Sequence, residues 1–227
     1  MTSASVAPVI AIDGPAASGK GTVAKGVAKT LGFHYLDSGS LYRLVALKAL
    51  RDAIPLDKEA PLAAAARDLK VEFAGEAIRL EGRDASTAIR EEPVSAAASR
   101  VAVYPGVRSA LLSRQRAFRR QPGLVADGRD MGTVVFPDAL LKAYVTASAE
   151  ERARRRYNQL IEKGNSVTLE GLLRDILERD VRDSARAAAP LKPAATALIL
   201  DTTDVTIDAA IAFVVHRYKA LAAAERP

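Results

Sequence analysis

Five short apolar runs, separated by longer stretches with helical periodicity, form the main pattern along the chain. The runs are Val9 to Asp13, Phe33 to Asp37, Leu124 to Asp127, Lys142 to Thr146 and Ala197 to Asp201. Such runs are typical of strands buried on both faces, and strands that alternate with helices form parallel sheets covered on both sides. The pattern therefore predicts an α/β fold with a five-stranded parallel sheet flanked by helices.

Four of these five runs end in aspartate. Open α/β sheets bind ligands beyond the carboxyl ends of their strands, so we expect the carboxylates near a ligand site. Asp13 and Asp201 are expected only to tie down the turns that follow their strands.

The alternation of apolar runs and helical stretches is interrupted between about residues 55 and 100. Two strand-like pieces, KVEFAG and AIRLEGRD, lie there with glycine turns between Ala-rich helical flanks. We expect a small α+β subdomain, inserted over 55–100 into a single domain of residues 1–227.

The stretch GPAASGKGT follows the first run and precedes a helical pattern that ends at Gly32. It fits the phosphate-loop spacing G-x-x-x-x-G-K, in which backbone N–H groups and a helix N-terminus hold an anion. The loop residues are Gly14, Pro15, Ala16, Ala17, Ser18, Gly19, Lys20, Gly21 and Thr22. Gly26, inside the predicted helix, costs about 1 kcal/mol relative to alanine.

Gly21 stands where a Ser or Thr usually follows the lysine, and Thr22 comes one position later. Its hydroxyl remains a candidate ligand for Mg²⁺. Asp127, at the end of an apolar run, is the second candidate, acting directly or through water.

Composition narrows the class of protein. The chain has 227 residues, 49% apolar and 26% charged, with no cysteine and two histidines. These numbers exclude disulfides and thiolate metal sites. No basic segment precedes an apolar one at the N-terminus, and no run approaches the roughly 18 apolar residues of a membrane span. We expect a cytoplasmic protein without a membrane partner.

The net charge of +6 raises the question of a nucleic-acid partner. The arginines cluster in RQRAFRR, RARRR and ERDVRDSAR, where acidic residues are interleaved, and aromatic residues make up only 5%. Stacking platforms for single strands are therefore scarce, and small anionic substrates explain the excess better than a polymer does.

The stretch LVADGRDMGTVVF places Arg129 and Asp130 just after Asp127. A donor and an acceptor at a strand end beside a phosphate loop favour substrate binding over a local ion pair in a turn. Asp127 is followed by glycine rather than glutamate, which disfavours an ATPase that activates water.

Four motifs together resemble the bacterial cytidylate kinase family: IDGPAASGKGT, YLDSGSLYR, ADGRDMGTVVFP and ERDVRDSARAAAPL. The similarity runs along nearly the whole chain, and the last three motifs are far more specific than the phosphate loop. The resemblance implies a P-loop nucleoside-monophosphate kinase with a monophosphate-binding insert and a helical lid. It also implies ATP and Mg²⁺ as cofactors and CMP or dCMP as substrate, within pyrimidine metabolism.

The resemblance assigns roles residue by residue. Those at the acceptor monophosphate would be Ser38, Arg43 and Arg129, with Tyr42 packing nearby. Those at the cytosine ring would be Ser99, Arg108 and Asp130. Those at the ribose and near the phosphates would be Asp183, Arg186 and Arg179. The catalytic cations would be Lys20, Arg129, Arg156 and Arg179.

The chemistry of the substrates agrees with these roles. Cytosine carries an amino group where uracil carries a carbonyl oxygen, so a carboxylate such as Asp130 accepts from the first and repels the second. A phosphate monoester has a second pKa near 6, so its oxygen is already ionised at neutral pH and no general base is needed.

Segment 150–168 is the candidate lid, because RARRR lies in it on a helical pattern that ends at Gly164. By resemblance, its arginines close over ATP and exclude water. We expect Arg156 to point inward, although periodicity alone does not decide between the arginines of this helix.

Two other classes remain open at this stage. A GTP-dependent switch or nucleic-acid-linked P-loop protein is disfavoured because the chain has no N-K-x-D or T-K-x-D string. A kinase of the same fold acting on a different small molecule is separated only by a panel of acceptors. A monomer is expected.

Overall fold

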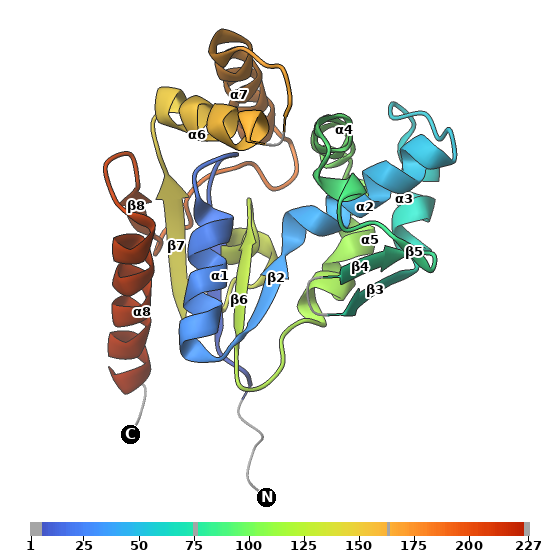
Figure 1. Ribbon diagram of the computed structural model, residues 1–227. Coiled ribbons are helices and arrows are strands. Elements are labelled where there is room, and N and C mark those ends of the chain that lie inside the picture. The colour runs from blue at the N-terminus through green and yellow to red at the C-terminus, as the bar shows by residue number, and fades with distance from the viewer. Residues whose placement is uncertain (1–5, 75–76, 163, 225–227) are drawn as a thin grey trace, which may run out of the picture. The chain divides into compact units, whose positions relative to one another are not determined.

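The computed structural model describes residues 6–74, 77–162 and 164–224 (Figure 1). The chain divides into two compact units. The core unit comprises Met1–Leu36 and Phe118–Pro227, and the inserted unit comprises Asp37–Ala117.

A five-stranded sheet organises the core unit. Its strands are β1 (Val9–Asp13), β2 (His34–Asp37), β6 (Leu124–Gly128), β7 (Leu141–Thr146) and β8 (Leu198–Asp201), in the order β2-β6-β1-β7-β8. β1 pairs in parallel with β6 and β7, and β7 pairs in parallel with β8. The predicted five-stranded α/β fold is confirmed, and each strand lies within two residues of its predicted bounds.

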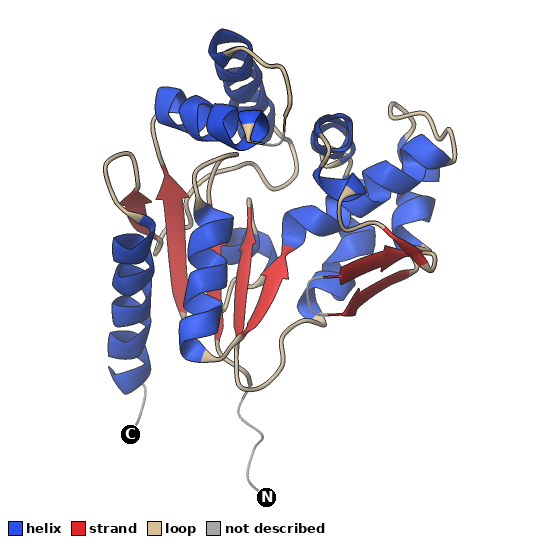
Figure 2. Cartoon of the chain, viewed as in Figure 1, coloured by secondary structure: helices blue, strands red, loops and turns tan. Residues whose placement is uncertain are grey.

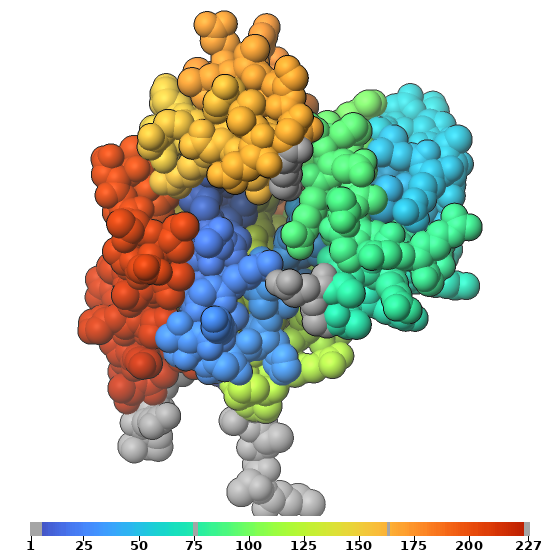
Figure 3. All heavy atoms as spheres, in the orientation of Figure 1, coloured from blue at the N-terminus to red at the C-terminus, as the bar shows by residue number. Residues whose placement is uncertain are grey.

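Apolar side chains on β1 explain why this strand is central. All five of its residues are buried. Ile10 and Ile12 join a core cluster with apolar residues of α1 (Lys20–Leu31) and α8 (Ile207–Ala224). Figure 3 shows α1 in blue and α8 in red lying against each other. These two helices therefore cover one face of the sheet.

The other face carries the π-helical turn η2 (Met131–Val135), which directly follows β6. A Cβ placed on Gly132 would lie 3.5 Å from the Cβ of Ala11 in β1. Because Ala11 alternates with Ile10 and Ile12, this contact puts η2 on the face opposite α1.

Two helices follow β7 at the edge where the strands end (Figures 1 and 2). They are α6 (Ala149–Ile161) and α7 (Leu169–Ser184), which pack on each other. Ser148 caps α6 and Thr168 caps α7, each through a side-chain oxygen that accepts a backbone N–H. Gly164 has a φ of +77°, as a glycine that closes a helix requires. Residue 163, within the predicted lid of 150–168, lies outside the described residues.

The inserted unit combines helices with a small antiparallel sheet, as predicted. Its elements are α2 (Ser38–Arg51), α3 (Glu59–Arg67), β3 (Val71–Ala74), β4 (Ala77–Leu80), β5 (Arg83–Asp84), η1 (Ala88–Arg90), α4 (Glu92–Val101) and α5 (Pro105–Arg116). The three strands pair antiparallel in the order β3-β4-β5, α2 packs on α4, and α3 packs on α5. The unit is wider than the segment 55–100 expected from the sequence.

Across the described ranges, we find no helix that combines the length and the apolar character needed to span a membrane.

Candidate active site

The loop Gly14–Thr22 connects β1 to α1, and its backbone shape depends on glycine. At Gly14 a Cβ would lie only 2.0 Å from the carbonyl oxygen of Val145, so any side chain there would clash with β7. Gly19 has a φ of +84° and forms the N-cap of α1. Ala17 also has a positive φ, of 57°, which costs an L-residue about 1 kcal/mol. The loop is therefore held in a strained, compact turn.

The N-terminus of α1 is suited to an anion. No side chain caps it, and its first turn contains no acidic residue. The partial positive charge of the helix end is thus left for a ligand. Lys20, the first residue of α1, donates from Nζ to the carbonyl oxygen of Pro15 at 3.2 Å, and so reaches back across the loop.

Asp127 places a carboxylate beside the first turn of α1. It is buried at the end of β6, and its Oδ2 accepts a 2.5 Å hydrogen bond from the hydroxyl of Tyr35. A Cβ on Gly21 would lie 3.7 Å from the same Oδ2. Thr22, the next residue, is exposed in that turn. Tyr35 lies in the motif YLDSGSLYR, but the sequence analysis assigned it no role.

These oxygens suit Mg²⁺, which is usually held in kinases by one or two carboxylates together with substrate phosphates. Within the described residues, no group of three or more His, Cys, Asp or Glu gathers into a further metal site. Asp127 and Thr22 are therefore the residues of this loop region that fit the ion.

Asp183 on α7 lies at the centre of a cluster of arginines. Its side chain is fully buried; Oδ2 accepts from Nε of Arg129 at 2.9 Å, and Oδ1 accepts from Nη2 of Arg186. Burial acts to raise the pKa of Asp183, but the guanidinium groups of Arg129, Arg186 and Arg179 hold it below its usual value. Three cations around one carboxylate leave an excess of positive charge, which suits a phosphate group.

Arg129 forms an ion pair outside its own turn, whereas the alternative interpretation was a local ion pair with Asp130. Its Nε donates to Asp183, and its Nη1 donates to the carbonyl oxygen of Gly128 at 3.2 Å. Asp130 is buried immediately before η2.

Asp13 holds the turn that carries these two residues. Its Oδ1 accepts the N–H of Met131 and its Oδ2 accepts the N–H of Gly132, both at 2.8 Å. Burial raises the pKa of Asp13 to about 6, against these two hydrogen bonds. Asp201 likewise accepts the N–H and the hydroxyl of Thr203, at 2.8 and 2.6 Å. The expectation that both aspartates tie down neighbouring turns is confirmed.

In the inserted unit, Ser38, Tyr42 and Arg43 lie on α2. Asp37 accepts the N–H of Ser40 as the N-cap of α2 and forms a 2.5 Å ion pair with Arg43. The guanidinium of Arg108 lies over the ring of Tyr42, 5.6 Å from its centroid. The packing role expected for Tyr42 thus includes a cation–π contact. Asp37 was expected near a ligand site as a strand-end carboxylate, but its ion pair with Arg43 was not predicted.

Three buried polar atoms of this unit have no hydrogen-bond partner among the described residues: Oγ of Ser99, Nε of Arg43 and Nε2 of Gln115. An unpaired buried polar atom costs about 1–3 kcal/mol, so the atoms of Ser99 and Arg43, two predicted site residues, are well placed to gain from a polar ligand.

The four arginines of α6 differ in the residues that they contact. Arg152 is buried, forms a bidentate pair with Asp180 of α7 at 3.0 and 2.6 Å, and donates to the carbonyl oxygen of Ala16 at 3.3 Å. Arg155 also contacts the loop, through the carbonyl oxygen of Ser18 at 3.4 Å.

The remaining two arginines of α6 bond within their own helix, Arg154 to Glu151 and Arg156 to Gln159 at 2.7 Å. In this conformation Arg152 and Arg155 reach the phosphate loop. Any role of Arg156 in the reaction stays a prediction.

The predicted site residues thus fall into two sets. In the core unit, the loop with Lys20 and Asp127 forms one group, and the arginines around Asp183 form another. Ser38, Tyr42, Arg43, Ser99 and Arg108 belong to the inserted unit.

A protein-family model described as "Cytidylate kinase" matches residues 10–220 of the chain. The chain belongs to the cytidylate kinase family. The resemblance noted in the four sequence motifs is thereby confirmed.

Curated members of the cytidylate kinase family are similar over nearly the whole chain. A cytidylate kinase of Bordetella bronchiseptica is 60% identical over 96% of this chain and 98% of its own. One of Chromobacterium violaceum is 60% identical over 90% of this chain and 92% of its own. The chain is accordingly a kinase of the nucleoside-monophosphate class.

Among solved structures, the chain is similar to a gluconokinase from Sinorhizobium meliloti 1021. The identity is 16% and the TM-score 0.48, over 96% of this chain and 94% of that chain. TT1252 from Thermus thermophilus is 22% identical with a TM-score of 0.45, over 98% and 100%.

Proposed function

We propose that this kinase transfers the γ-phosphoryl group of ATP, in the presence of Mg²⁺, to the phosphate of CMP or dCMP. The products are ADP and CDP or dCDP. The observation that supports this most is the phosphate loop at the uncapped N-terminus of α1 in a member of the cytidylate kinase family.

The donor phosphates are bound by the loop Gly14–Thr22. Its backbone N–H groups and the end of α1 attract the anion, and Lys20 exchanges its bond with Pro15 for one with an outer phosphate oxygen. Asp127 and Thr22 hold Mg²⁺, directly or through water. The ion, when bound, neutralises charge on the phosphate oxygens.

The acceptor phosphate is attracted by arginines. In the core unit, Asp183 keeps Arg129 and Arg186 in place through charge-assisted bonds. The charge of Arg179 also acts on this carboxylate. Asp183 also offers its carboxylate to the ribose hydroxyls. In the inserted unit, Ser38 and Arg43 bind the acceptor phosphate, with Tyr42 as packing.

No proton transfer to the protein is required. The acceptor phosphate is ionised near neutral pH, so alignment and charge neutralisation are the main contributions of the chain. Lys20, Arg129, Arg179 and a lid arginine, Arg156 by our prediction, supply the positive charge.

Cytosine is selected by hydrogen bonds. The buried carboxylate of Asp130 accepts from the amino group of cytosine and repels the carbonyl oxygen of uracil. Arg108 and Ser99 donate to the ring acceptors, and Ser99 has a buried hydroxyl without a partner among the described residues. Leaving such groups unpaired costs about 1–3 kcal/mol, which gives a strong preference between the two pyrimidines.

The direct test is a coupled assay of ADP release with ATP and Mg²⁺ and a panel of acceptors: CMP, dCMP, UMP, AMP and shikimate. Activity with CMP or dCMP well above the other acceptors is the expected result. No ADP release with either cytidine nucleotide contradicts the proposal, and activity with shikimate alone favours a kinase of another small molecule. Light scattering tests the further proposal of a monomer.

Asp130→Asn offers a sharper test of specificity. The amide can donate to the carbonyl oxygen of uracil, so kcat/KM for UMP relative to CMP should rise about tenfold or more, which corresponds to about 1.4 kcal/mol. Steady-state rates with both acceptors measure this ratio.

Asp138→Asn is the matched control, because Asp138 is 60% exposed and its carboxylate pairs with Arg119 outside these groups. An unchanged ratio in Asp130→Asn, or the same change in Asp138→Asn, would show that Asp130 does not read the base.

A further inference from the structure

Thr202, just after β8, places a buried hydroxyl against the phosphate loop. Its Oγ1 lies 3.1 Å from the carbonyl oxygen of Ser18 and 3.0 Å from that of Thr146. Thr202 is 4% exposed and Ser18 is fully buried. No nucleotide-binding motif of the sequence includes Thr202, and the reaction described above does not use it.

The backbone of Thr202 is fixed by the sheet. Its N–H donates to the carbonyl oxygen of Thr146 at 2.8 Å, which continues the parallel pairing of β7 with β8 by one residue. The hydroxyl therefore projects toward the loop from a rigid support.

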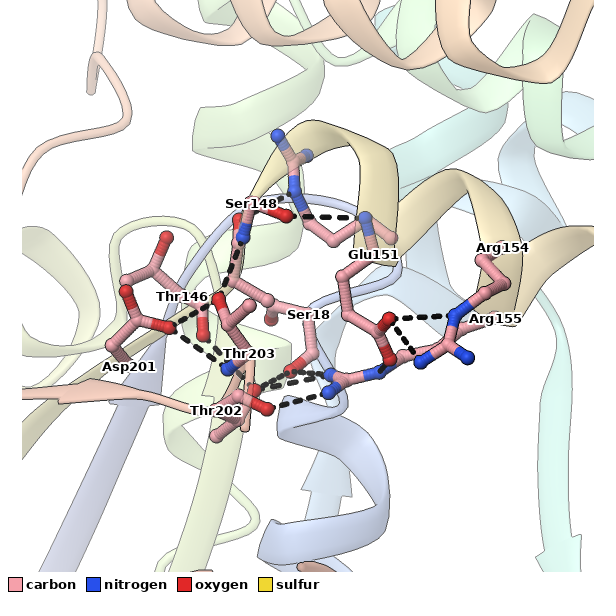
Figure 4. Close-up of polar contacts among 11 residues, drawn as sticks. Ser18, Thr146, Ser148, Glu151, Arg154, Arg155, Asp201, Thr202 and Thr203 are labelled. Carbon is pink, nitrogen blue, oxygen red and sulfur yellow. Dashed lines mark hydrogen bonds and ion pairs between the residues drawn. The ribbon is translucent and has the colours of Figure 1, made fainter. Parts of the chain in front are cut away.

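Arg155 of α6 completes the arrangement (Figure 4). Its Nη2 donates to the carbonyl oxygen of Thr202 at 2.5 Å, and its Nη1 donates to Thr202 Oγ1 at 3.1 Å and to the carbonyl oxygen of Ser18 at 3.4 Å. Glu151 accepts from Nε of Arg155 at 2.8 Å and orients the guanidinium.

The Thr202 hydroxyl has a single hydrogen to donate, and its surroundings favour a hydrogen bond to the phosphate loop. A hydroxyl has one hydrogen to donate and can accept two bonds. Thr146 already receives the backbone N–H of Thr202, and Arg155 donates to the hydroxyl oxygen. The carbonyl of Ser18 receives Arg155 at the longer distance of 3.4 Å, so the hydrogen of the hydroxyl is best donated to this carbonyl.

This bond fixes the direction of the next N–H. In a planar trans peptide, the carbonyl of Ser18 and the N–H of Gly19 point in opposite directions. A carbonyl held toward Thr202 therefore aims the Gly19 N–H away from it. Gly19 is the N-cap of α1, where N–H groups bind anions.

The side chain of Ser18 also lies close to the first glycine of the loop. A Cβ on Gly14 would lie 3.3 Å from Ser18 Oγ, so this hydroxyl lies across the loop from the first glycine. The carbonyl of Ser18 is held by Thr202, and its hydroxyl lies near Gly14.

We propose that Thr202 is a positioning residue for the donor nucleotide, holding the Ser18–Gly19 peptide so that the Gly19 N–H is aimed at a donor phosphate. This inference rests on the proposed use of the loop for ATP. Arg155 supports Thr202 by binding both its carbonyl and its hydroxyl.

Thr202→Val tests this role because it removes the hydroxyl and keeps the shape of the side chain. KM for ATP, measured at saturating CMP, should rise about fivefold, the effect of one lost neutral hydrogen bond. KM for CMP, measured at saturating ATP, should stay within about twofold. Thr202→Ser keeps the hydroxyl and should restore KM for ATP.

Thr203→Val is the matched control. The hydroxyl of Thr203 binds Asp201 and accepts the N–H of Ser148, and it has no bond to the phosphate loop. Binding of ADP, followed by calorimetry, gives a second readout of donor affinity, which should fall in Thr202→Val alone.

The inference is overturned if Thr202→Val leaves KM for ATP and the affinity for ADP unchanged. It is also overturned if both KM values rise equally, or if Thr203→Val has the same effect, because general loosening would then explain the result. A wild-type chain that makes no CDP would contradict the proposed function instead, so the two failures are distinguishable.

Discussion

At the scale of single residues, Asp13 shows how a buried charge can serve the site while lowering stability. Its carboxylate is 4% exposed and accepts two backbone N–H groups of the turn after β6. Burial nevertheless raises the pKa of Asp13 from 3.8 to about 6. The hydrogen bonds thus offset only part of the cost of removing the carboxylate from water.

The raised pKa of Asp13 predicts the direction in which the free energy of unfolding changes with pH. A folded-state pKa above the unfolded value means that its contribution is fully present below about pH 3.8 and is lost as the pH rises through about 6. The free energy of unfolding of the wild type, relative to Asp13→Asn, should therefore fall between pH 4 and 6, by about 3 kcal/mol. Urea unfolding across this range measures the difference.

Asp201→Asn is the control for this measurement. The hydroxyl and the N–H of Thr203 lower the pKa of Asp201, so its contribution is lost only as the pH falls. The free energy of unfolding of the wild type, relative to Asp201→Asn, should therefore not decline between pH 4 and 6. A flat difference for Asp13→Asn would show that the carboxyl titrates alike in the folded and unfolded chain.

Some of these residue roles could be predicted from the sequence and others could not. Asp13 ends a buried strand, so a role in holding a turn follows from position. A helical period shows which arginines share a face, but it does not show what that face contacts. The contact of Arg155 with Ser18 was therefore not predicted. The hydroxyl of Thr202 belongs to no spacing pattern, because its partners come from distant segments.

At the scale of secondary-structure elements, the packing of α1 on α8 explains Gly26. Intrinsic propensity disfavours glycine inside a helix, by about 1 kcal/mol. A Cβ at this position would lie 2.2 Å from Cδ1 and 2.8 Å from Cγ1 of Ile211 on α8. A Cβ at Gly26 would force the side chain of Ile211 to move, and glycine avoids this repacking.

Gly26→Ala should therefore destabilise the protein despite the better helix propensity of alanine. We expect a net loss of about 1 kcal/mol in the free energy of unfolding, because overpacking costs 1–3 kcal/mol. Ile211→Ala removes the clashing atoms, so the double variant should be more stable than the sum of the two single changes, by about 1 kcal/mol. Additive effects in urea unfolding would contradict this account of the helix contact.

Element bounds were predictable where composition changes abruptly. The five strands of the core sheet are apolar runs that end at polar residues, and glycines end α1 and α6. The inserted unit was harder, because α2 has the same helical period as the core helices. Its packing on α4, α3 and η1 assigns it to the unit Asp37–Ala117.

At the scale of the whole molecule, the basic clusters of the sequence are interrupted by local ion pairs. In the described chain, arginines of the three basic clusters pair with acidic partners: Arg119 with Asp138, Arg152 with Asp180, Arg154 and Arg155 with Glu151, and Arg186 with Asp183. A net charge of +6 therefore does not present a continuous basic stripe for a polymer along these clusters.

We expect oligonucleotide binding to be weak and salt-sensitive. A single-stranded oligonucleotide retained at low salt should be released before an ionic strength of about 0.15 M, because each phosphate contact adds to the salt dependence. Fluorescence anisotropy of a labelled oligonucleotide measures the release, with CMP and ATP binding followed at the same salt. Tight binding at physiological salt would instead indicate a nucleic-acid partner.

The division of the chain also bears on its synthesis. β1 lies at the centre of the core sheet, yet both of its neighbours, β6 and β7, are encoded after residue 117. The inserted unit, by contrast, has all of its strands and helices once Ala117 has emerged from the ribosome. During translation the insert can therefore fold first. β1 and its phosphate loop have no neighbouring strands in the sheet until the second half of the polypeptide has been synthesised.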